Sequence, residues 1–203
     1  MAINTFATLK TAIADFLNRD DLTAIIPDFV TLAEAQHRRD IRDYRMVTRA
    51  ALTINAQFEA MPSDWLQTIR ITIDASPTRV LQQVSMNDMT QYRESNSDTS
   101  GVPLYFAHIG SEIEIWPTPG DTYTGAISYF AKPTALAAAG DSNWLLLAAP
   151  DIYLYGALIH SAPYLKDDGR AAIWAGLYAQ AVQSMADESE QARFGGPLRM
   201  RIK

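Results

Sequence analysis

The sequence predicts an α+β fold: a four-helix bundle of two N-terminal and two C-terminal helices, an inserted small antiparallel β-sheet domain, and an extended C-terminal arm. Three observations lead to this prediction. Hydrophobic residues recur at helical spacing near both ends of the chain, and they alternate with polar residues in the middle. A Gly-Gly-Pro motif at 195–197 follows the last helical stretch and does not favour further helix.

Two helices are predicted at the amino-terminal end. The first follows a cap at Asn4 or Thr5, and its apolar positions are Phe6, Leu9, Ile13, Phe16 and Leu17. Pro27 suits the first turn of the second helix, where a backbone N–H has no helical partner. The stripe of this second helix consists of Val30, Ala33, His37, Ile41 and Tyr44. We expect the two helices to form an antiparallel pair.

The middle of the chain has the period of β-strands. From about Thr48 apolar and polar residues alternate, and they do so again at Ile69, Ile71 and Ile73. A hairpin is predicted around Gly110-Ser111, with a further strand over 123–130. The polar stretch 94–101 is interpreted as a flexible loop. These patterns predict a small antiparallel sheet of five or six strands.

Residues 143–168 are apolar and aromatic on almost every side of a helix, so this segment needs neighbours all round, some of which we expect from other copies. Its helix is predicted from about Pro150 to Ser161, where Pro163 ends or kinks it. A last helix begins near Asp167 and Asp168. Its stripe consists of Ile173, Trp174, Leu177, Tyr178, Ala181 and Met185.

Four regions follow from these patterns. Residues 1–47 form the N-terminal helical pair, 48–132 the inserted β domain, 133–190 the C-terminal helical pair, and 191–203 the extended arm. The four helices are expected to pack as one bundle, because either pair alone would leave an apolar stripe uncovered.

Charge is unevenly placed along a chain whose net charge is −6. Five arginines lie between Arg38 and Arg49, whereas seven acidic residues lie between Asp141 and Glu190. The tail 191–203 has four basic residues and no acidic one. The net charge argues against a protein that coats nucleic acid. Without cysteine or a long apolar run, the sequence predicts a protein made in the cytoplasm that neither binds a metal through thiolates nor spans a membrane.

No catalytic or metal site is predicted, and no cofactor. His37, His108 and His160 lack metal or triad spacing and are interpreted as core or interface residues. Glu112 and Glu114 share one face of a strand, where a carboxylate pair could do acid–base work, but exposed sheet faces have the same pattern. Serine elbows and phosphate-binding glycine loops are absent from the sequence.

Four arginines form a candidate basic ridge: Arg38, Arg42, Arg45 and, if the helix continues far enough, Arg49. On a helix they would lie close together, beside the apolar stripe. One interpretation is a solvated face balanced by nearby acids. The others are contact with an acidic surface of a partner subunit, or a lining that faces passing DNA without reading its bases.

The tail is interpreted as an arm that orders when it docks. Its apolar anchors, Phe194, Leu198 and Met200, are spaced among the cations Arg193, Arg199 and Arg201. A disordered chain end is the alternative.

Several segments resemble the head-to-tail adaptor, or connector, proteins of tailed bacteriophages, in the same order over nearly the whole chain. They are Phe6 to Leu17 with Asn18-Arg19-Asp20-Asp21-Leu22, Asn143-Trp144-Leu145-Leu146, Pro150 to Leu158, Ala162 to Asp168, and Gly195 to Arg201. The C-terminal segments are fairly specific in combination, whereas the β region resembles the family only in its pattern.

The resemblance implies a structural virion protein at the head-to-tail junction and no catalysis. Such proteins form a ring, commonly a dodecamer, that docks on the portal protein, extends the DNA channel and offers a platform to the tail or nozzle protein. Non-specific contact with packaged DNA is then expected, and contact with a membrane is not. We expect the aromatic residues of the C-terminal helices to pack the ring: Trp144, Tyr153, Tyr155, Trp174 and Tyr178.

Two other functions remain open at this point. The strand aromatics Trp65, Tyr105, Trp116 and Tyr129 could offer flat faces to a carbohydrate. A cell-wall hydrolase of a phage tail could use Glu112 or Glu114, although no residue pair matches a hydrolase motif.

Overall fold

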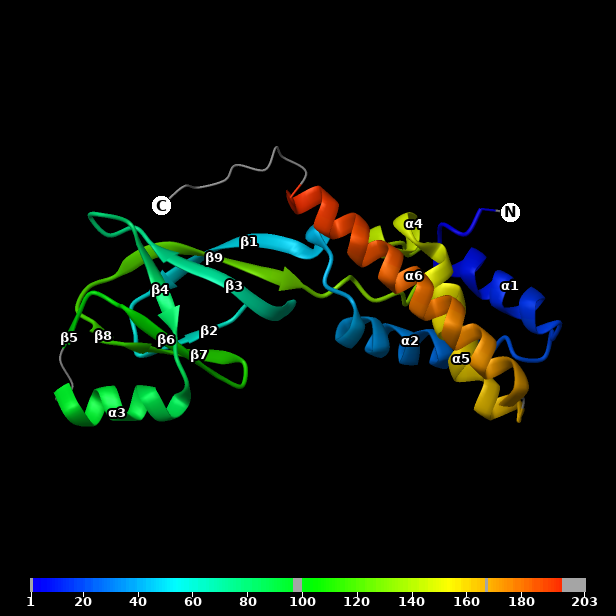
Figure 1. Ribbon diagram of the computed structural model, residues 1–203, viewed down its shortest axis with the longest axis horizontal. Coiled ribbons are helices and arrows are strands. Elements are labelled where there is room, and N and C mark those ends of the chain that lie inside the picture. Colours follow the sequence, from blue (N-terminus) through cyan, green and yellow to red (C-terminus); the bar gives the residue numbers. More distant parts are fainter. Residues whose placement is uncertain (1, 97–99, 167, 195–203) are drawn as a thin grey trace, which may run out of the picture. The chain divides into compact units, whose positions relative to one another are not determined.

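The computed structural model describes residues 2–96, 100–166 and 168–194 (Figure 1). These residues form two compact units. The helical unit combines the residues up to Arg45 with those from Pro133 onward, and the β unit comprises Met46–Lys132.

The described part of the helical unit contains five α-helices. They are α1 (Phe6–Leu17), α2 (Ile26–Asp40), α4 (Trp144–Ala148), α5 (Pro150–Leu165) and α6 (Asp168–Phe194). Helix α5 packs against all four of the others. The predicted four-helix bundle with a small sheet is therefore wrong: the helices surround one central helix, and the sheet is large.

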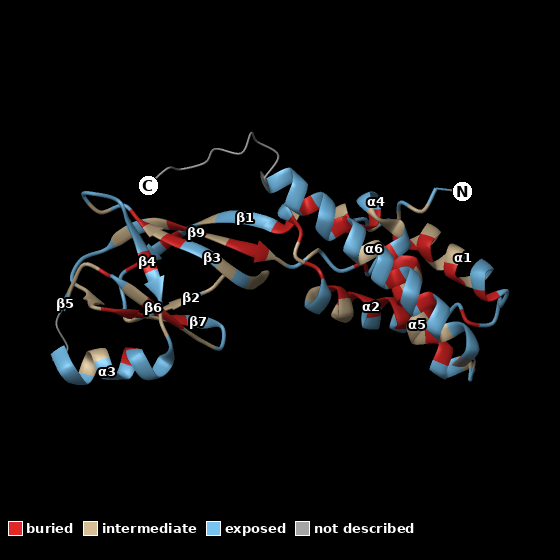
Figure 2. Cartoon of the chain, in the orientation of Figure 1, coloured by how far each residue is buried: buried red, intermediate tan, exposed pale blue. Residues whose placement is uncertain are grey.

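Helix α5 occupies the centre because its apolar surface is not confined to one stripe. Its buried positions are Ile152, Tyr153, Leu154, Gly156, Ala157, Leu158, Ser161 and Ala162. Figure 2 shows buried stretches, in red, along α5. The neighbours that such a helix requires come from the same chain. Pro163 lies within the last turn of α5, which continues to Leu165 and ends at Lys166 with a φ of 56°.

The ends of the helices follow local chemistry. Thr5 caps α1 by accepting a hydrogen bond from Thr8 N, and the Thr8 side chain in turn accepts from the Thr5 backbone. Asn143 caps α4 through a hydrogen bond from Leu146 N of 2.9 Å. Helix α2 ends at Asp40, because Ile41 takes an extended conformation with φ −102° and ψ 131°.

The β unit contains a curled mixed sheet of seven strands in the order β1-β9-β3-β4-β6-β7-β2. A separate pair is formed by β5 (Ser100–Gly101) and β8 (Thr118–Pro119). The seven strands are β1 (Val47–Ile54), β2 (Phe58–Ala60), β3 (Trp65–Ile73), β4 (Arg79–Gln83), β6 (Tyr105–Ile109), β7 (Glu112–Trp116) and β9 (Tyr123–Ala131). The predicted hairpin at Gly110 is confirmed between β6 and β7, with a φ of 60° at that glycine.

The sheet is mixed because helix α3 (Met86–Asn96) connects β4 to β6, which are parallel. Parallel neighbours need a crossover rather than a tight turn. The sequence prediction has no helix here, since Met89 is the only buried residue of α3 and no apolar stripe marks it. Its start is nevertheless capped: Ser85 Oγ accepts from Asp88 N and lies 2.7 Å from the Asp88 carboxylate.

The larger core cluster of the β unit lies on one face of the sheet, and a smaller one of Met89, Ala107 and Trp116 lies on the other face under α3. The larger cluster is built mainly from aliphatic side chains of the long strands: Leu52, Ile54, Ile71, Ile73, Leu81, Phe106, Ile113, Ile115, Ile127 and Tyr129. Strands β1 and β3 both pair with β9, which is therefore a central strand with one core face and one outer face. The face of the sheet opposite the core residues Ile71 and Ile127 is called its outer face.

Candidate interaction surfaces

The four arginines of the predicted ridge do not share one helical face. Arg38 lies in α2, which ends two residues later, and Arg42 follows the helix. Arg45 lies in a 3₁₀ turn over 44–46, and Arg49 lies in β1 of the other unit. The prediction assumed a helix that continued past Asp40, so its geometric basis is corrected.

Arg42 and Arg45 are both engaged within the helical unit. Arg42 Nη1 donates to the carbonyl oxygens of Arg38 and Ile41, at 2.8 and 2.6 Å. In doing so it caps the carboxyl end of α2, where carbonyl groups lack helical partners. Arg45 Nη2 donates to Glu188 Oε1 of α6 at 2.6 Å.

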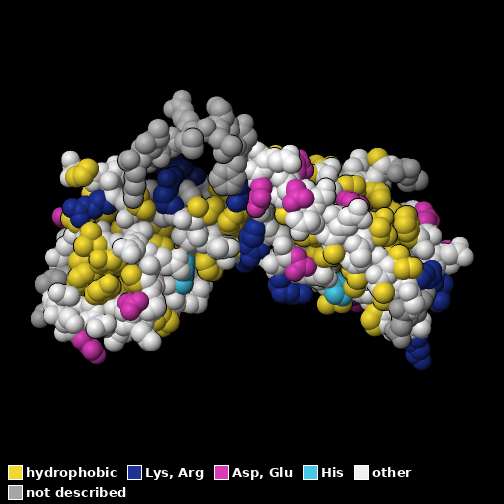
Figure 3. Space-filling model, in the orientation of Figure 1, with side chains coloured by type: hydrophobic (Ala, Val, Ile, Leu, Met, Phe, Trp, Pro, Cys, Tyr) yellow, Lys and Arg dark blue, Asp and Glu magenta, His cyan; other side chains and the backbone are white. Residues whose placement is uncertain are grey.

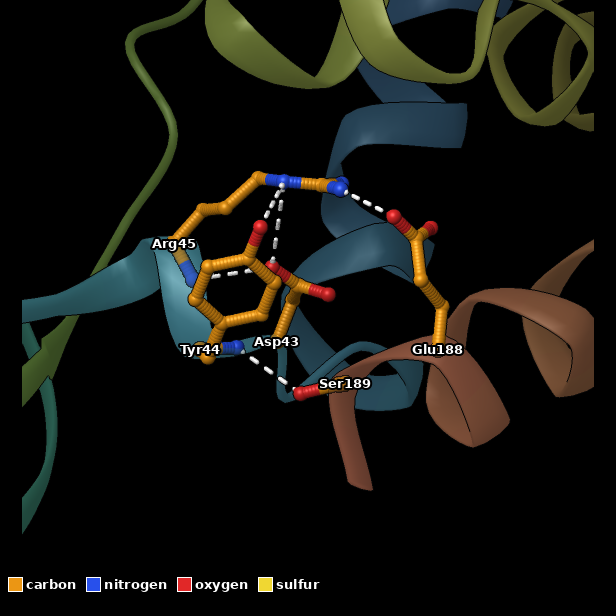
Figure 4. Close-up of polar contacts among 5 residues, drawn as sticks. All are labelled: Asp43, Tyr44, Arg45, Glu188 and Ser189. Atoms are coloured by element: carbon orange, nitrogen blue, oxygen red, sulfur yellow. Dashed lines mark hydrogen bonds and ion pairs between the residues drawn. The ribbon is translucent and has the colours of Figure 1, made fainter. Parts of the chain in front are cut away.

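Figure 4 shows the polar contacts between residues 43–45 and the carboxyl end of α6. The backbone N–H of Tyr44 donates to Ser189 Oγ at 2.9 Å, and that of Arg45 donates to Asp43 Oδ1 at 2.8 Å. The Arg45 guanidinium also lies over the Tyr44 ring, 4.9 Å from its centroid. Ser189 is buried, whereas Glu188 is exposed. An exposed ion pair adds at most about 1 kcal/mol, so these contacts depend mainly on the two buried side chains, Ser189 and Asp43. Asp43 Oδ1 also lies 3.9 Å from Arg45 Nε.

The aromatic residues predicted to pack a ring lie in α4, α5 and α6. Tyr153, Trp174 and Tyr178 are buried within the helical unit, and Trp144 and Tyr155 are half-buried. Exposed hydrophobic side chains occur instead at other positions of both units (Figure 3). On the helical unit they include Phe16, Leu32, Leu147, Tyr164, Ile173 and Leu177.

The docking arm falls largely outside the described residues. Arg193 and Phe194 are the last residues of α6, so the helix extends beyond the predicted arm boundary at 191. Leu198, Arg199, Met200 and Arg201 lie outside the described part of the chain.

A buried polar network joins the helices of the helical unit. Tyr153 Oη donates to Glu34 Oε1 at 3.3 Å and accepts from Asn143 Nδ2 at 2.7 Å. Glu34 Oε1 also accepts from Leu136 N at 2.9 Å. Burial raises the pKa of Glu34 and that of Tyr153. The network links α2, α5 and the cap of α4, and so fixes the register of these helices.

His37 is packed between two tyrosines in this core. Its ring lies edge-on to Tyr153, with centroids 4.8 Å apart, and is stacked with Tyr178 at 5.9 Å. Burial lowers the pKa of His37 to about 4, so this histidine is neutral at physiological pH. Burial also lowers the pKa values of His108 and His160. Within the described residues no group of three or more His, Asp or Glu side chains could hold a metal ion.

The strand aromatics do not form an exposed platform for a carbohydrate. Trp116 and Tyr129 are buried, and Tyr129 Oη donates to Asp64 Oδ1 at 2.8 Å. Burial raises the pKa of Tyr129 to about 12. Tyr105 stacks on Tyr92 of α3, with ring centroids 4.9 Å apart. Trp116 also stacks on Tyr92, with ring centroids 5.6 Å apart. Tyr105 and Trp116 therefore hold α3 against the sheet.

The two carboxylates of the candidate pair on β7, Glu112 and Glu114, have different surroundings. Glu114 Oε1 accepts from Arg93 Nε of α3 at 2.7 Å and from Gln57 Nε2 at 3.1 Å. Arg93 Nη2 also donates to Ile115 O at 2.8 Å. Glu112 is exposed. Glu114 therefore serves to fasten α3 to the sheet.

A family model described as SU10 adaptor protein matches residues 4–201. A search of curated proteins found no match to the chain. Among the described residues no helix is long and apolar enough to cross a membrane.

Proposed function

Because the chain belongs to the SU10 adaptor protein family, a family of phage head-to-tail adaptors, we propose that it forms a ring at the head-to-tail junction. The ring docks on the portal protein, extends the DNA channel and provides the attachment platform for the tail or nozzle protein. One observation carries this proposal: the family match spans 198 of the chain's residues, from 4 to 201, and so includes both units.

The distribution of charge supports assembly into a ring. A ring of identical copies uses a heterologous interface, in which one patch meets a different patch on the next copy. The chain offers unlike patches, since acidic residues gather in the last turns of α6 while arginines are exposed on the β unit. The exposed hydrophobic residues of both units add apolar area for contacts with other virion proteins.

The assembly of particles tests the proposal. Without this chain, infected cells should accumulate DNA-filled heads that lack tails and lose their DNA, whereas the complete chain supplied in trans should restore tailed particles. Electron microscopy and a nuclease-protection assay measure both outcomes. Normal tailed particles without the chain would show that the proposed role is wrong.

The docking arm remains a proposal based on its sequence. In the assembled junction, the basic and apolar residues from Arg193 to Lys203 reach the portal or the adjacent copy. Deleting residues 195–203 leaves every described residue of α6 in place. The truncated chain should bind purified portal rings at least tenfold more weakly than the complete chain. Equal affinity and normal ring formation would remove the arm from the proposal.

The arginines after α2 are proposed to face the DNA channel or a neighbouring subunit. Arg38 and Arg42 lie at the carboxyl end of this helix, and Arg45 already pairs with Glu188. Because the Arg42 guanidinium caps α2, the charge is reversed at Arg38 alone. The Arg38→Glu chain should be impaired in either DNA retention or ring assembly, and the affected step identifies which surface this end of α2 faces. Normal assembly together with normal DNA retention would contradict both assignments.

A further inference from the structure

The outer face of the β sheet carries a row of three polar side chains. Ser128 of β9 is the register partner of Arg49 in β1 and also of Arg70 in β3. Direct partners in antiparallel strands project to the same face. Ile127 and Ile71 are paired with each other and belong to the core, so the three polar residues project to the opposite side. We call Arg49, Ser128 and Arg70 the arginine row.

The arginine row is open to a partner. Arg49 and Arg70 are exposed, and Ser128 between them is half-buried. Within residues 2–96, 100–166 and 168–194, neither arginine forms a hydrogen bond or an ion pair. Two strand spacings separate their Cα atoms by about 9.5 Å. Two guanidinium groups flanking a small residue can therefore hold two carboxylates side by side.

Exposed aliphatic residues next to the row favour a protein partner over DNA. Val47 is two residues before Arg49 on the same face and is 43% exposed. Val80 is the partner of Thr72, two residues after Arg70, and is 61% exposed. Arginine among apolar side chains is typical of protein–protein interfaces, whereas contacts to phosphates use cationic and polar groups.

The last two turns of α6 carry the complementary charge. Asp187 and Glu190 are exposed and lie three residues apart, so they share one side of the helix. The buried residues Met185 and Ser189 lie on another side. Acidic residues near the carboxyl end of a helix are unfavourable for its macrodipole. Asp187 Oδ1 accepts a hydrogen bond from Gln183 Nε2 one turn earlier, at 2.8 Å, and Glu188 already pairs with Arg45. Helix stability does not explain the presence of Glu190.

We propose that the arginine row of one copy binds Asp187 and Glu190 of α6 in a neighbouring copy. The proposal rests on the ring proposed above and assigns it one interface. Side chains three residues apart on a helix have Cβ atoms about 5–6 Å apart, and the two arginine side chains are long enough to converge on such a pair. The contact joins unlike patches, as a heterologous interface requires, and arginine–carboxylate pairing gives it geometric specificity.

Charge exchange tests the pairing in assembled particles. The Arg49→Glu/Arg70→Glu chain and the Asp187→Arg/Glu190→Arg chain should each be incorporated at least tenfold less than the wild-type chain. A chain with all four substitutions should recover to within about twofold of wild type, because the pairs are restored with opposite sign. Arg79→Glu is the matched control, since this exposed arginine pairs with the core residue Ile73 and lies on the other face. Normal incorporation of either reversed chain would overturn the proposal.

Disulfide cross-linking decides the case in which all the charge variants fail to assemble. The chain has no cysteine, so an engineered pair reports one contact only. Particles that contain the Arg70→Cys/Glu190→Cys chain should give a ladder of linked chains after mild oxidation, and each single substitution should give none. Only single-chain bands from particles that contain the chain would overturn this interface and leave the proposed function standing. Absence of the wild-type chain from particles would instead contradict the proposed function.

Discussion

Because α2 and α5 lie close together, we predict different effects on stability when a methyl group is added at Gly156 of α5 and at Gly176 of α6. A Cβ atom placed on Gly156 would lie 3.0 Å from His37 Nε2 and 3.2 Å from Ala33 Cβ. The His37 ring has no room to retreat, because Tyr153 and Tyr178 pack on it. A Cβ atom on Gly176 in α6 would meet no atom within 4 Å among the described residues. Both glycines are helical, so one substitution compares two environments.

Gly176→Ala should stabilise the chain by about 1 kcal/mol, which is the helix-propensity difference between the two residues. Gly156→Ala gains the same term, but overpacking of a tight core costs about 1–3 kcal/mol. The two variants should therefore differ by about 1–3 kcal/mol, with Gly156→Ala the less stable. At about 2–4 °C per kcal/mol for a chain of this size, the difference is measurable by thermal melting.

Urea unfolding followed by circular dichroism at 222 nm gives the free energies directly, provided that the m-values agree. Equal stabilisation by both substitutions would refute the reasoning, because it would mean that α2 and α5 leave room for a methyl group at Gly156. A lower stability of both variants would contradict the exposed position of Gly176.

Three further outcomes are expected. Tyr153→Phe removes a hydroxyl that bridges Asn143 to a buried carboxylate, and should lower the free energy of unfolding by about 1–3 kcal/mol in urea titrations. The folded chain lowers the pKa of His37 to about 4, so the unfolded chain binds the additional proton between about pH 4 and 6.5. Stability should fall by about 3 kcal/mol as the pH drops through that window, and a His37→Gln chain measured in the same buffers should lose less. Arg93→Ala breaks the contact to Glu114 and should increase amide hydrogen exchange in α3 more than in β9.

Local signals predicted the elements that depend on nearby residues. The hydroxyl of Thr5 caps α1, and Gly110 provides the positive φ that the β6–β7 hairpin requires. Alternation from about Thr48 indicated the long strand that begins at Val47. These features are readable because their cause lies within a few residues of their effect.

The architecture was predicted less well, because it depends on pairings between distant segments. Helix α3 has no apolar stripe, and the capping pair Ser85 and Asp88 was the signal that could have revealed it. Without that helix the strands β4 and β6 are expected to be antiparallel, although they are parallel. The apolar surface all round α5 indicated that this helix needs many neighbours, but the local pattern did not show that α1, α2, α4 and α6 of the same chain provide them.

The candidate surfaces show the same limit. The basic ridge was inferred from helical spacing, but α2 ends at Asp40 and Arg49 belongs to a strand. Arg70 was not recognised from the sequence, because its position beside Ser128 depends on a strand that begins more than fifty residues later. The register of β9 is what brings Arg49 and Arg70 to one face.

The helical unit is built from two segments that are separated in the sequence by the whole β unit, so its helices are synthesised at different times. Helices α1 and α2 leave the ribosome well before α5, because the segment from Asp40 to Pro150 includes the whole β unit. At about 5–20 residues per second, roughly 5–20 s pass before their central partner emerges. During that delay Phe6, Leu9 and Ile13 have no cover from α5, and a chaperone that binds short apolar segments has its best opportunity there. Slowing translation after Lys132 should therefore increase chaperone capture of the nascent chain.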